Sequence, residues 1–264
     1  MSDSAAGLRG PLRGLKIVEI GAIGPVPFAA MMLSDLGAEI IRVERSASRV
    51  GEAISSKPLF GRGRRSIALN LKTDEGLEAL LRLVEGADGL MEGFRPGVTE
   101  RLGFGPEACL ERNPRLVYGR MTGWGQDGPM AMMAGHDINY IALSGALHAI
   151  GREGQPPTPP LNLVGDFGGG GMLLAYGMLA AFMERVQSGQ GQVVDAAMIE
   201  GAGLLMTMFF EMVAEGGWKN QRASNLLDSG APFYDVYVTK DEKYVSFGAL
   251  EPKFFTMFVH AIGR

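Results

Sequence analysis

Residues 135–172 contain the side chains of this chain that are best suited to proton transfer, in the sequence GHDINYIALSGALHAIGREGQPPTPPLNLVGDFGGGGM. His136 and Asp137 precede an apolar run, and Asp166 stands between a proline-rich segment and four consecutive glycines. Imidazole and carboxylate groups are common general acids and bases. Glycine has no Cβ and lets backbone amides approach a ligand closely, which makes Asp166 a candidate catalytic residue.

Each of these residues also has an ordinary structural interpretation. Aspartate is a favoured N-cap residue, so Asp166 could cap a helix that begins near Gly169, and the local pattern alone favours this role. An isolated histidine such as His136 is often a hydrogen-bonded structural residue. Both interpretations remain open at this level.

The composition excludes several classes of function. The 264 residues carry a formal net charge of -4, which gives no basic excess for binding nucleic acid. A single cysteine and three histidines without HExxH spacing predict no metal site. The loop 21–27 lacks the GxGxxG fingerprint and contains Pro25 and Pro27, which have no amide to offer a phosphate, so a nicotinamide cofactor is disfavoured.

Alternating strands and helices predict an α/β fold with a Rossmann-like parallel sheet. Apolar strand segments are expected at 15–20, 89–91, 116–121 and 193–196, with a helix opened by Thr73 between the first two. Ligands of such sheets bind beyond the carboxyl ends of the strands. Arg62, Arg64 and Arg65 could form a phosphate-binding platform there or a solvated edge, and the sequence does not decide between them.

The second half of the chain predicts long helices and then a small α+β unit. We expect helices over 171–185 and 198–214, and the apolar segments 172–183 and 204–213 are too short to span a membrane. A hairpin and a short helix follow. We therefore expect a large α/β domain over 1–200, a linker helix and loop over 201–228, and the start of a small α+β domain over 229–264. A core of that size is insufficient alone, which predicts a truncated chain or help from another subunit.

Several stretches in order along the chain resemble the family III CoA-transferase (CaiB/BaiF-like) superfamily, and within it the α-methylacyl-CoA racemases. They are GAIGPVPFAAMMLSDLGAEIIRVER, EGFRPGVTERLGFGPE, RLVYGRMTGWGQDGP, AGHDINYIALSG, PPLNLVGDFGGGGM, GQGQVVDAAMIEG, NLLDSGAPFYDVY and GALEPKFF. The resemblance implies an isomerase that inverts the α-carbon of 2-methylacyl-CoA thioesters by acid/base proton transfer through an enolate. It implies no cofactor, because CoA is part of the substrate.

The resemblance also implies roles for individual residues. His136 and Asp166 would be the two proton-transfer groups, and Glu251 of the ALEP motif would hydrogen-bond the histidine, although it could instead cap the helix at Pro252. The Asp166 amide would face the enolate oxygen. The positions expected to bind CoA are Arg45, Lys72, Arg95, Arg101, Asp137 and Tyr140.

Two alternatives remain. One is a family III CoA-transferase that uses Asp166 as a nucleophile, although His136 favours the racemase because transferases of this fold do not share that histidine. The other is a truncated, non-catalytic CoA-binding chain. The resemblance further implies an interlocked homodimer. We expect a soluble, cytoplasmic protein without a membrane span, while a targeting signal beyond residue 264 could direct it to an organelle.

Overall fold

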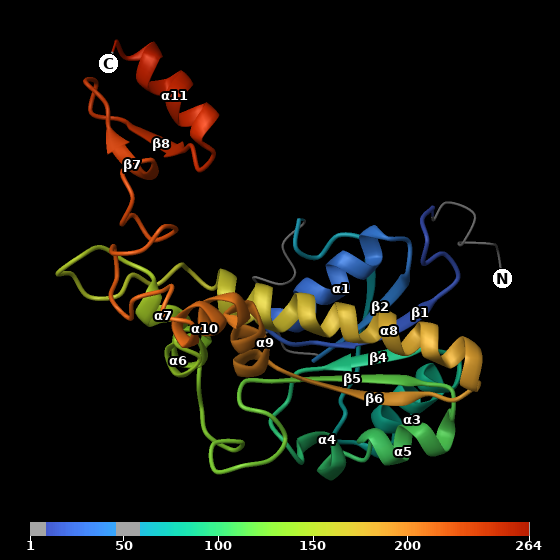
Figure 1. Ribbon diagram of the computed structural model, residues 1–264. Coiled ribbons are helices and arrows are strands. Elements are labelled where there is room, and N and C mark those ends of the chain that lie inside the picture. Colours follow the sequence, from blue (N-terminus) through green and yellow to red (C-terminus); the bar gives the residue numbers. More distant parts are fainter. Residues whose placement is uncertain (1–8, 46–58, 264) are drawn as a thin grey trace.

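One six-stranded parallel sheet forms the centre of the molecule, in the strand order β3-β2-β1-β4-β5-β6 (Figure 1). The computed structural model describes residues 9–45 and 59–263. The strands are β1 (Lys16–Ile20), β2 (Glu39–Glu44), β3 (Arg64–Ala68), β4 (Gly89–Glu92), β5 (Val117–Thr122) and β6 (Gln192–Ala197). This arrangement confirms the predicted α/β fold.

Helices cover both faces of the sheet, with α1 and α8 on one face and α3 and α5 on the other (Figure 1). The helices of this unit are α1 (Pro25–Asp35), α3 (Asp74–Glu85), α4 (Val98–Arg101), α5 (Pro106–Arg112), α6 (Asp137–Leu143), α7 (Ala146–Ala149), the π-helix η2 (Leu163–Met172), α8 (Leu173–Ser188), α9 (Met198–Leu205) and α10 (Thr207–Ala214). Thr73 caps α3 as predicted, since its hydroxyl accepts a hydrogen bond from the Gly76 amide.

Every residue of β4 and β5 is buried, which is typical of parallel strands covered on both faces. Successive side chains point to opposite faces, so Ile17 and Met91 join the core under α1 and α8. Val18 and Leu90 join the core under α3 and α5. From β1 the chain adds β2 and β3 on one side and then β4, β5 and β6 on the other, so the strand order reverses between β1 and β4, where ligands of such sheets usually bind.

The helix after the proline-rich segment is longer than predicted, because it begins at Leu163 with one π-helical stretch and continues as α8 to Ser188. By length and composition, this 26-residue stretch is the one described segment apolar enough to cross a membrane. It is longer than the apolar segment expected over 172–183, which is too short to span a membrane. However, α8 packs on α1, β5 and β6, as the core helix of an α/β fold does.

The single helix predicted over 198–214 is wrong, because the chain breaks into α9 and α10 at Met206. The Thr207 hydroxyl donates a 2.7 Å hydrogen bond to the Leu204 carbonyl, and the Met206 amide bonds the Gly203 carbonyl three residues back. A side-chain hydroxyl that competes for a helical carbonyl favours such a break.

The C-terminal residues form a separate small unit of antiparallel strands and one helix, as the hairpin pattern predicted. It consists of β7 (Tyr234–Val238), β8 (Tyr244–Gly248) and α11 (Pro252–Ala261). Figure 1 shows this unit standing away from the sheet and joined to it by a coil.

The backbones of η2 and α9 approach each other closely at a pair of glycines. A Cβ on Gly201 would lie 1.8 Å from the Gly169 carbonyl oxygen, and one on Gly169 would lie 2.5 Å from the Ala202 amide nitrogen. Neither contact involves a flexible side chain that could move. The packing of η2 therefore requires glycine at both positions.

We predict that Gly201→Ala lowers the free energy of unfolding by about 1–3 kcal/mol, the usual cost of overpacking. Gly203 of the same helix is the matched control, because a Cβ there meets nothing within 4 Å. Gly203→Ala should raise stability by about 0.5–1 kcal/mol through better helix propensity. Urea denaturation followed by circular dichroism measures both, and equal effects of the two substitutions would contradict the prediction.

Candidate active site

A pocket of about 250 Å³ opens at the carboxyl ends of β1, β4 and β5, at the point where the strand order reverses. Loops that follow these strands and the start of α6 form its walls. The residues of this pocket that bear on the chemistry are Ile23, Phe94, Arg95, Trp124, His136, Tyr140 and Met198. Loops that were expected from the sequence beyond the carboxyl ends of the strands therefore line this pocket.

Asp166 lies inside η2 and does not cap a helix, so the capping interpretation is wrong. Its carboxylate Oδ2 accepts a 3.0 Å hydrogen bond from Asn162 Nδ2. Burial raises the pKa of Asp166, the Asp137 charge raises it further, and Asn162 and His136 oppose this shift. The run of glycines allows the wide π-helical turn that places this acid mid-helix, and such turns are frequent at functional sites.

His136 is the N-cap residue of α6 and its side chain is exposed. Asn139 holds its backbone, because the His136 amide donates to Asn139 Oδ1 at 3.0 Å and the His136 carbonyl accepts from the Asn139 amide at 2.8 Å. The ring borders the pocket and is near enough to lower the pKa of Asp166. The structure thus brings His136 and Asp166 together.

Asp137 joins the two helices that carry these groups. Its buried carboxylate accepts a 2.7 Å hydrogen bond at Oδ2 from the Asp166 amide. That amide is therefore occupied, which corrects the expectation that it faces an enolate oxygen. Among the described residues, Asp137 Oδ1 has no hydrogen-bond donor although it is buried. An unsatisfied buried acceptor of this kind is costly unless a ligand supplies the donor.

Tyr140 forms the floor of the pocket. Its ring packs against the backbone at Gly123 and Gly135, where an added Cβ would lie 2.3 Å and 2.8 Å from ring atoms. Trp124 meets it edge-on at a centroid distance of 4.7 Å. Burial raises the pKa of Tyr140 and the Asp166 charge adds to this, while Arg95 lowers it. Arg95, Tyr140 and Asp166 therefore share one electrostatic environment.

Two of the other predicted CoA-binding cations lie together in a second pocket. Lys72 and Arg101 line a polar space of about 440 Å³ between the start of α3 and the end of α4. Arg45 is exposed just after β2 and lines neither pocket. The structure therefore groups Lys72 with Arg101, places Arg95 in the pocket that His136 also lines, and leaves Arg45 apart from both pockets.

The phosphate platform suggested for Arg62, Arg64 and Arg65 is wrong, because carboxylates already pair all three. Arg64 is buried and bonds Glu19 Oε2 at 2.7 Å. The other two pair with surface carboxylates, Arg62 with Asp35 and Arg65 with Glu39. A guanidinium already paired in this way is a poor phosphate ligand.

Glu251 is the N-cap residue of α11, and its side chain is exposed and makes no capping hydrogen bond. Only its backbone carbonyl accepts bonds from the amides of Phe254 and Phe255. Figure 1 shows α11 far from α6, so one chain does not bring Glu251 to His136.

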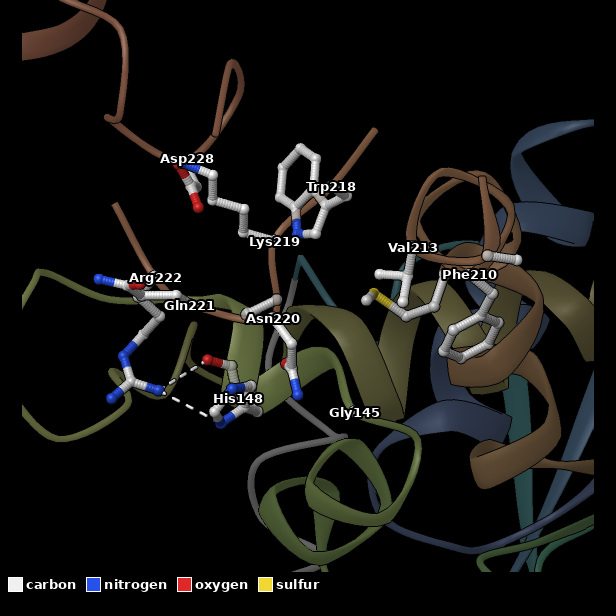
Figure 2. Close-up of a pocket in the computed structure, with 13 residues that line it drawn as sticks. Gly145, His148, Phe210, Val213, Trp218, Lys219, Asn220, Gln221, Arg222 and Asp228 are labelled. Carbon is white, nitrogen blue, oxygen red and sulfur yellow. Dashed lines mark hydrogen bonds between the residues drawn. The ribbon is translucent and has the colours of Figure 1, made fainter. Parts of the chain in front are cut away.

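A larger apolar pocket of about 440 Å³ lies elsewhere, between α7, α10 and the coil that follows (Figure 2). Phe210, Val213 and Trp218 form its apolar surface, and Arg222 donates to the His148 carbonyl at 2.9 Å. It contains none of the predicted catalytic residues. The smaller pocket at the sheet edge is therefore the candidate active site.

Asn162 and Trp124 are two residues of the candidate site that were not predicted from the sequence. Asn162 stands four positions before Asp166, a spacing that brings two side chains to one face of a helix, and this signal could have identified it. Within residues 9–45 and 59–263, no group of three or more histidine, cysteine or acidic side chains is placed to hold a metal ion.

Known proteins match nearly the whole chain. Alpha-methylacyl-CoA racemase of Mus musculus is 46% identical over 96% of this chain, and that of Homo sapiens is 44% identical over the same share. The chain spans 65% of the length of each racemase. The crystal structure of Rv3272 from M. tuberculosis superposes with a TM-score of 0.78 at 31% identity, covering 98% of this chain and 70% of that one. The model of CoA-transferase family III matches residues 12–264, and the chain therefore belongs to that family.

Proposed function

We propose that this chain inverts the α-carbon of 2-methylacyl-CoA thioesters by moving protons through His136 and Asp166. The observation that carries the proposal is that His136 lines the sheet-edge pocket and lies close to Asp166, where burial raises the pKa of that acid and the nearby His136 lowers it. The similarity to two alpha-methylacyl-CoA racemases supports it.

Inversion next to a thioester carbonyl requires a base on one face of the α-carbon and an acid on the other. One group removes the α-proton, the electron pair moves onto the carbonyl oxygen to give an enolate, and the other group returns a proton. For the opposite epimer the roles exchange. The reaction is redox-neutral and needs no dissociable cofactor.

The neighbours of Asp166 suit a group that must both take and give a proton. Burial and the Asp137 charge favour its protonated form, while Asn162 donates to its carboxylate and favours the ionised form. The unsatisfied Oδ1 of Asp137 is an acceptor for an amide N–H, which the pantetheine arm of CoA carries.

Three cations would bind the phosphates of CoA. Lys72 and Arg101 border the polar pocket beside α4, and Arg95 lines the sheet-edge pocket together with His136. The nucleotide would lie over α4 and the thioester beside His136. In an interlocked homodimer, Glu251 of the partner subunit would complete the site by hydrogen-bonding the histidine.

A CoA-transferase activity is the second candidate, because the family that the chain belongs to carries that name. In that reaction Asp166 would attack the thioester and form an acyl anhydride as CoA leaves. Trapping with hydroxylamine would convert Asp166 into a hydroxamate, which the proton-transfer mechanism does not produce.

We predict that the chain, incubated with either epimer of 2-methyldecanoyl-CoA in heavy water, yields α-deuterated product of both configurations. His136→Gln and Asp166→Asn should each lower inversion by roughly 10²–10⁴-fold, the usual contribution of a general acid or base. Mass spectrometry and chiral chromatography measure exchange and inversion.

His148→Gln provides the matched control, because His148 borders the apolar pocket of Figure 2 and lies outside the candidate site. This variant should keep the inversion rate of the unchanged chain. Inversion that persists in either site variant, or acyl transfer to an added carboxylic acid without exchange, would overturn the proposal. The oligomeric state of each sample is measured by light scattering.

We also predict that Asn162→Ala moves the pH dependence of inversion. Asn162 stabilises the ionised carboxylate, so its loss raises the pKa of Asp166. The limb of the pH–rate profile that reports the ionisation of Asp166 should therefore shift to higher pH. Loss of one hydrogen bond to a charged group should also lower the rate roughly tenfold. The other limb, which belongs to a different group, should stay in place, and an Asp166 limb that moves to lower pH would contradict this role.

A further inference from the structure

Arg120 is a buried cation beneath the loop that joins β4 to α4, outside the catalytic pair. It lies on β5 opposite Glu92 of β4 in the strand register, and the side chains of both are almost fully buried. Both point to the face of the sheet that carries α4 and α5, since Tyr118 shares that face and its ring lies 5.9 Å from the guanidinium carbon. A buried charge pair of this kind is expensive to maintain unless its geometry serves a purpose.

Both oxygens of Glu92 are in use. Oε1 accepts from Arg120 Nε at 3.3 Å, and Oε2 accepts from the Phe94 amide at 2.6 Å. Phe94 and Arg95 line the candidate active site directly after β4. Glu92 therefore links the buried arginine to the backbone of the turn that carries Arg95.

The guanidinium of Arg120 also contacts α4. Its Nη2 lies 2.9 Å from Glu100 Oε1 and 3.5 Å from the Thr99 hydroxyl. Glu100 precedes Arg101 and lines the same polar pocket as Lys72. One guanidinium thus holds two points of the segment 92–101, one before Arg95 and one before Arg101.

We propose that Arg120, acting through Glu92 and Glu100, is a positioning residue that sets Arg95 and Arg101 at the spacing needed to bind the phosphates of a CoA thioester. The identity of the ligand in this inference rests on the proposed function. The positioning role of Arg120 rests on the hydrogen bonds and ion pairs described above. Burial raises the pKa of Glu92 to about 7, and the hydrogen bond from the Phe94 amide and the charge of Arg120 oppose this rise.

A further carboxylate, that of Asp195, lies near Arg120. Asp195 on β6 neighbours Arg120 in the register, and burial raises its pKa while Arg120 lowers it. Three carboxylates from β4, α4 and β6 therefore surround Arg120. This arrangement fixes the guanidinium from several directions and leaves it unsuited to bind phosphate itself.

Glu92→Gln tests the proposal with little change in shape. An amide has one acceptor oxygen where the carboxylate has two, so either Arg120 or the Phe94 amide must lose its partner. We expect hydrogen exchange of the amides of Gly93, Phe94 and Arg95 to become roughly tenfold faster. We expect the Kd for CoA, measured by calorimetry, to rise roughly fivefold to tenfold, and KM to rise with kcat changed less than about twofold.

Two further variants separate positioning from general destabilisation. Glu100→Gln should weaken CoA binding through Arg101 alone and leave exchange at Phe94 unchanged. Arg112→Gln removes an arginine that bridges Glu78 and Glu85 on the outer surface of α3 and α5, and it should change neither exchange in 93–101 nor affinity for CoA.

Unchanged exchange and unchanged CoA affinity in Glu92→Gln would overturn the inference while leaving the proposed function intact. An unchanged chain that binds no CoA would overturn the proposed function, and the ligand part of this inference with it. The exchange measurement needs no ligand, so it decides in either case whether Glu92 positions the turn.

Discussion

The hydrogen bond from the Asp166 amide to the Asp137 carboxylate sets the geometry of the candidate site. Asp137 follows His136 at the start of α6, and Asp166 lies within η2, so this 2.7 Å contact ties together the helices that carry His136 and Asp166. The close approach of Gly169 and Gly201 holds η2 against α9 in turn. These contacts therefore fix how η2, which carries Asp166, lies against α6 and α9.

The same contact has an electrostatic consequence. Asp137 brings a negative charge beside Asp166 and, with burial, raises its pKa, while Asn162 and the nearby His136 lower it. These opposing effects are what the proposed reaction requires of a carboxyl group, which would release a proton to one epimer and remove one from the other. A carboxylate held only by donors would be a weaker base, and one surrounded only by apolar groups would stay protonated. The environment of Asp166 lies between these limits.

The sequence predicted features that depend on local patterns and failed where distant partners decide. Strand periodicity and the Thr73 cap are local, and both were confirmed. The π-helix around Asp166 depends on packing against α9, more than thirty residues later, so a capping role was the natural local interpretation. Arg64 looked available for phosphate because its partner, Glu19, lies 45 positions earlier. The surroundings of Glu251 depend on where the C-terminal unit lies, which no local pattern encodes.

Two separate networks support the site, and they meet at Tyr140. Asp137 joins the helices that carry His136 and Asp166, whereas Arg120 supports the segment that carries Arg95. Burial raises the pKa of Tyr140, the charge of Asp166 raises it further and Arg95 lowers it, so both networks act on this one side chain.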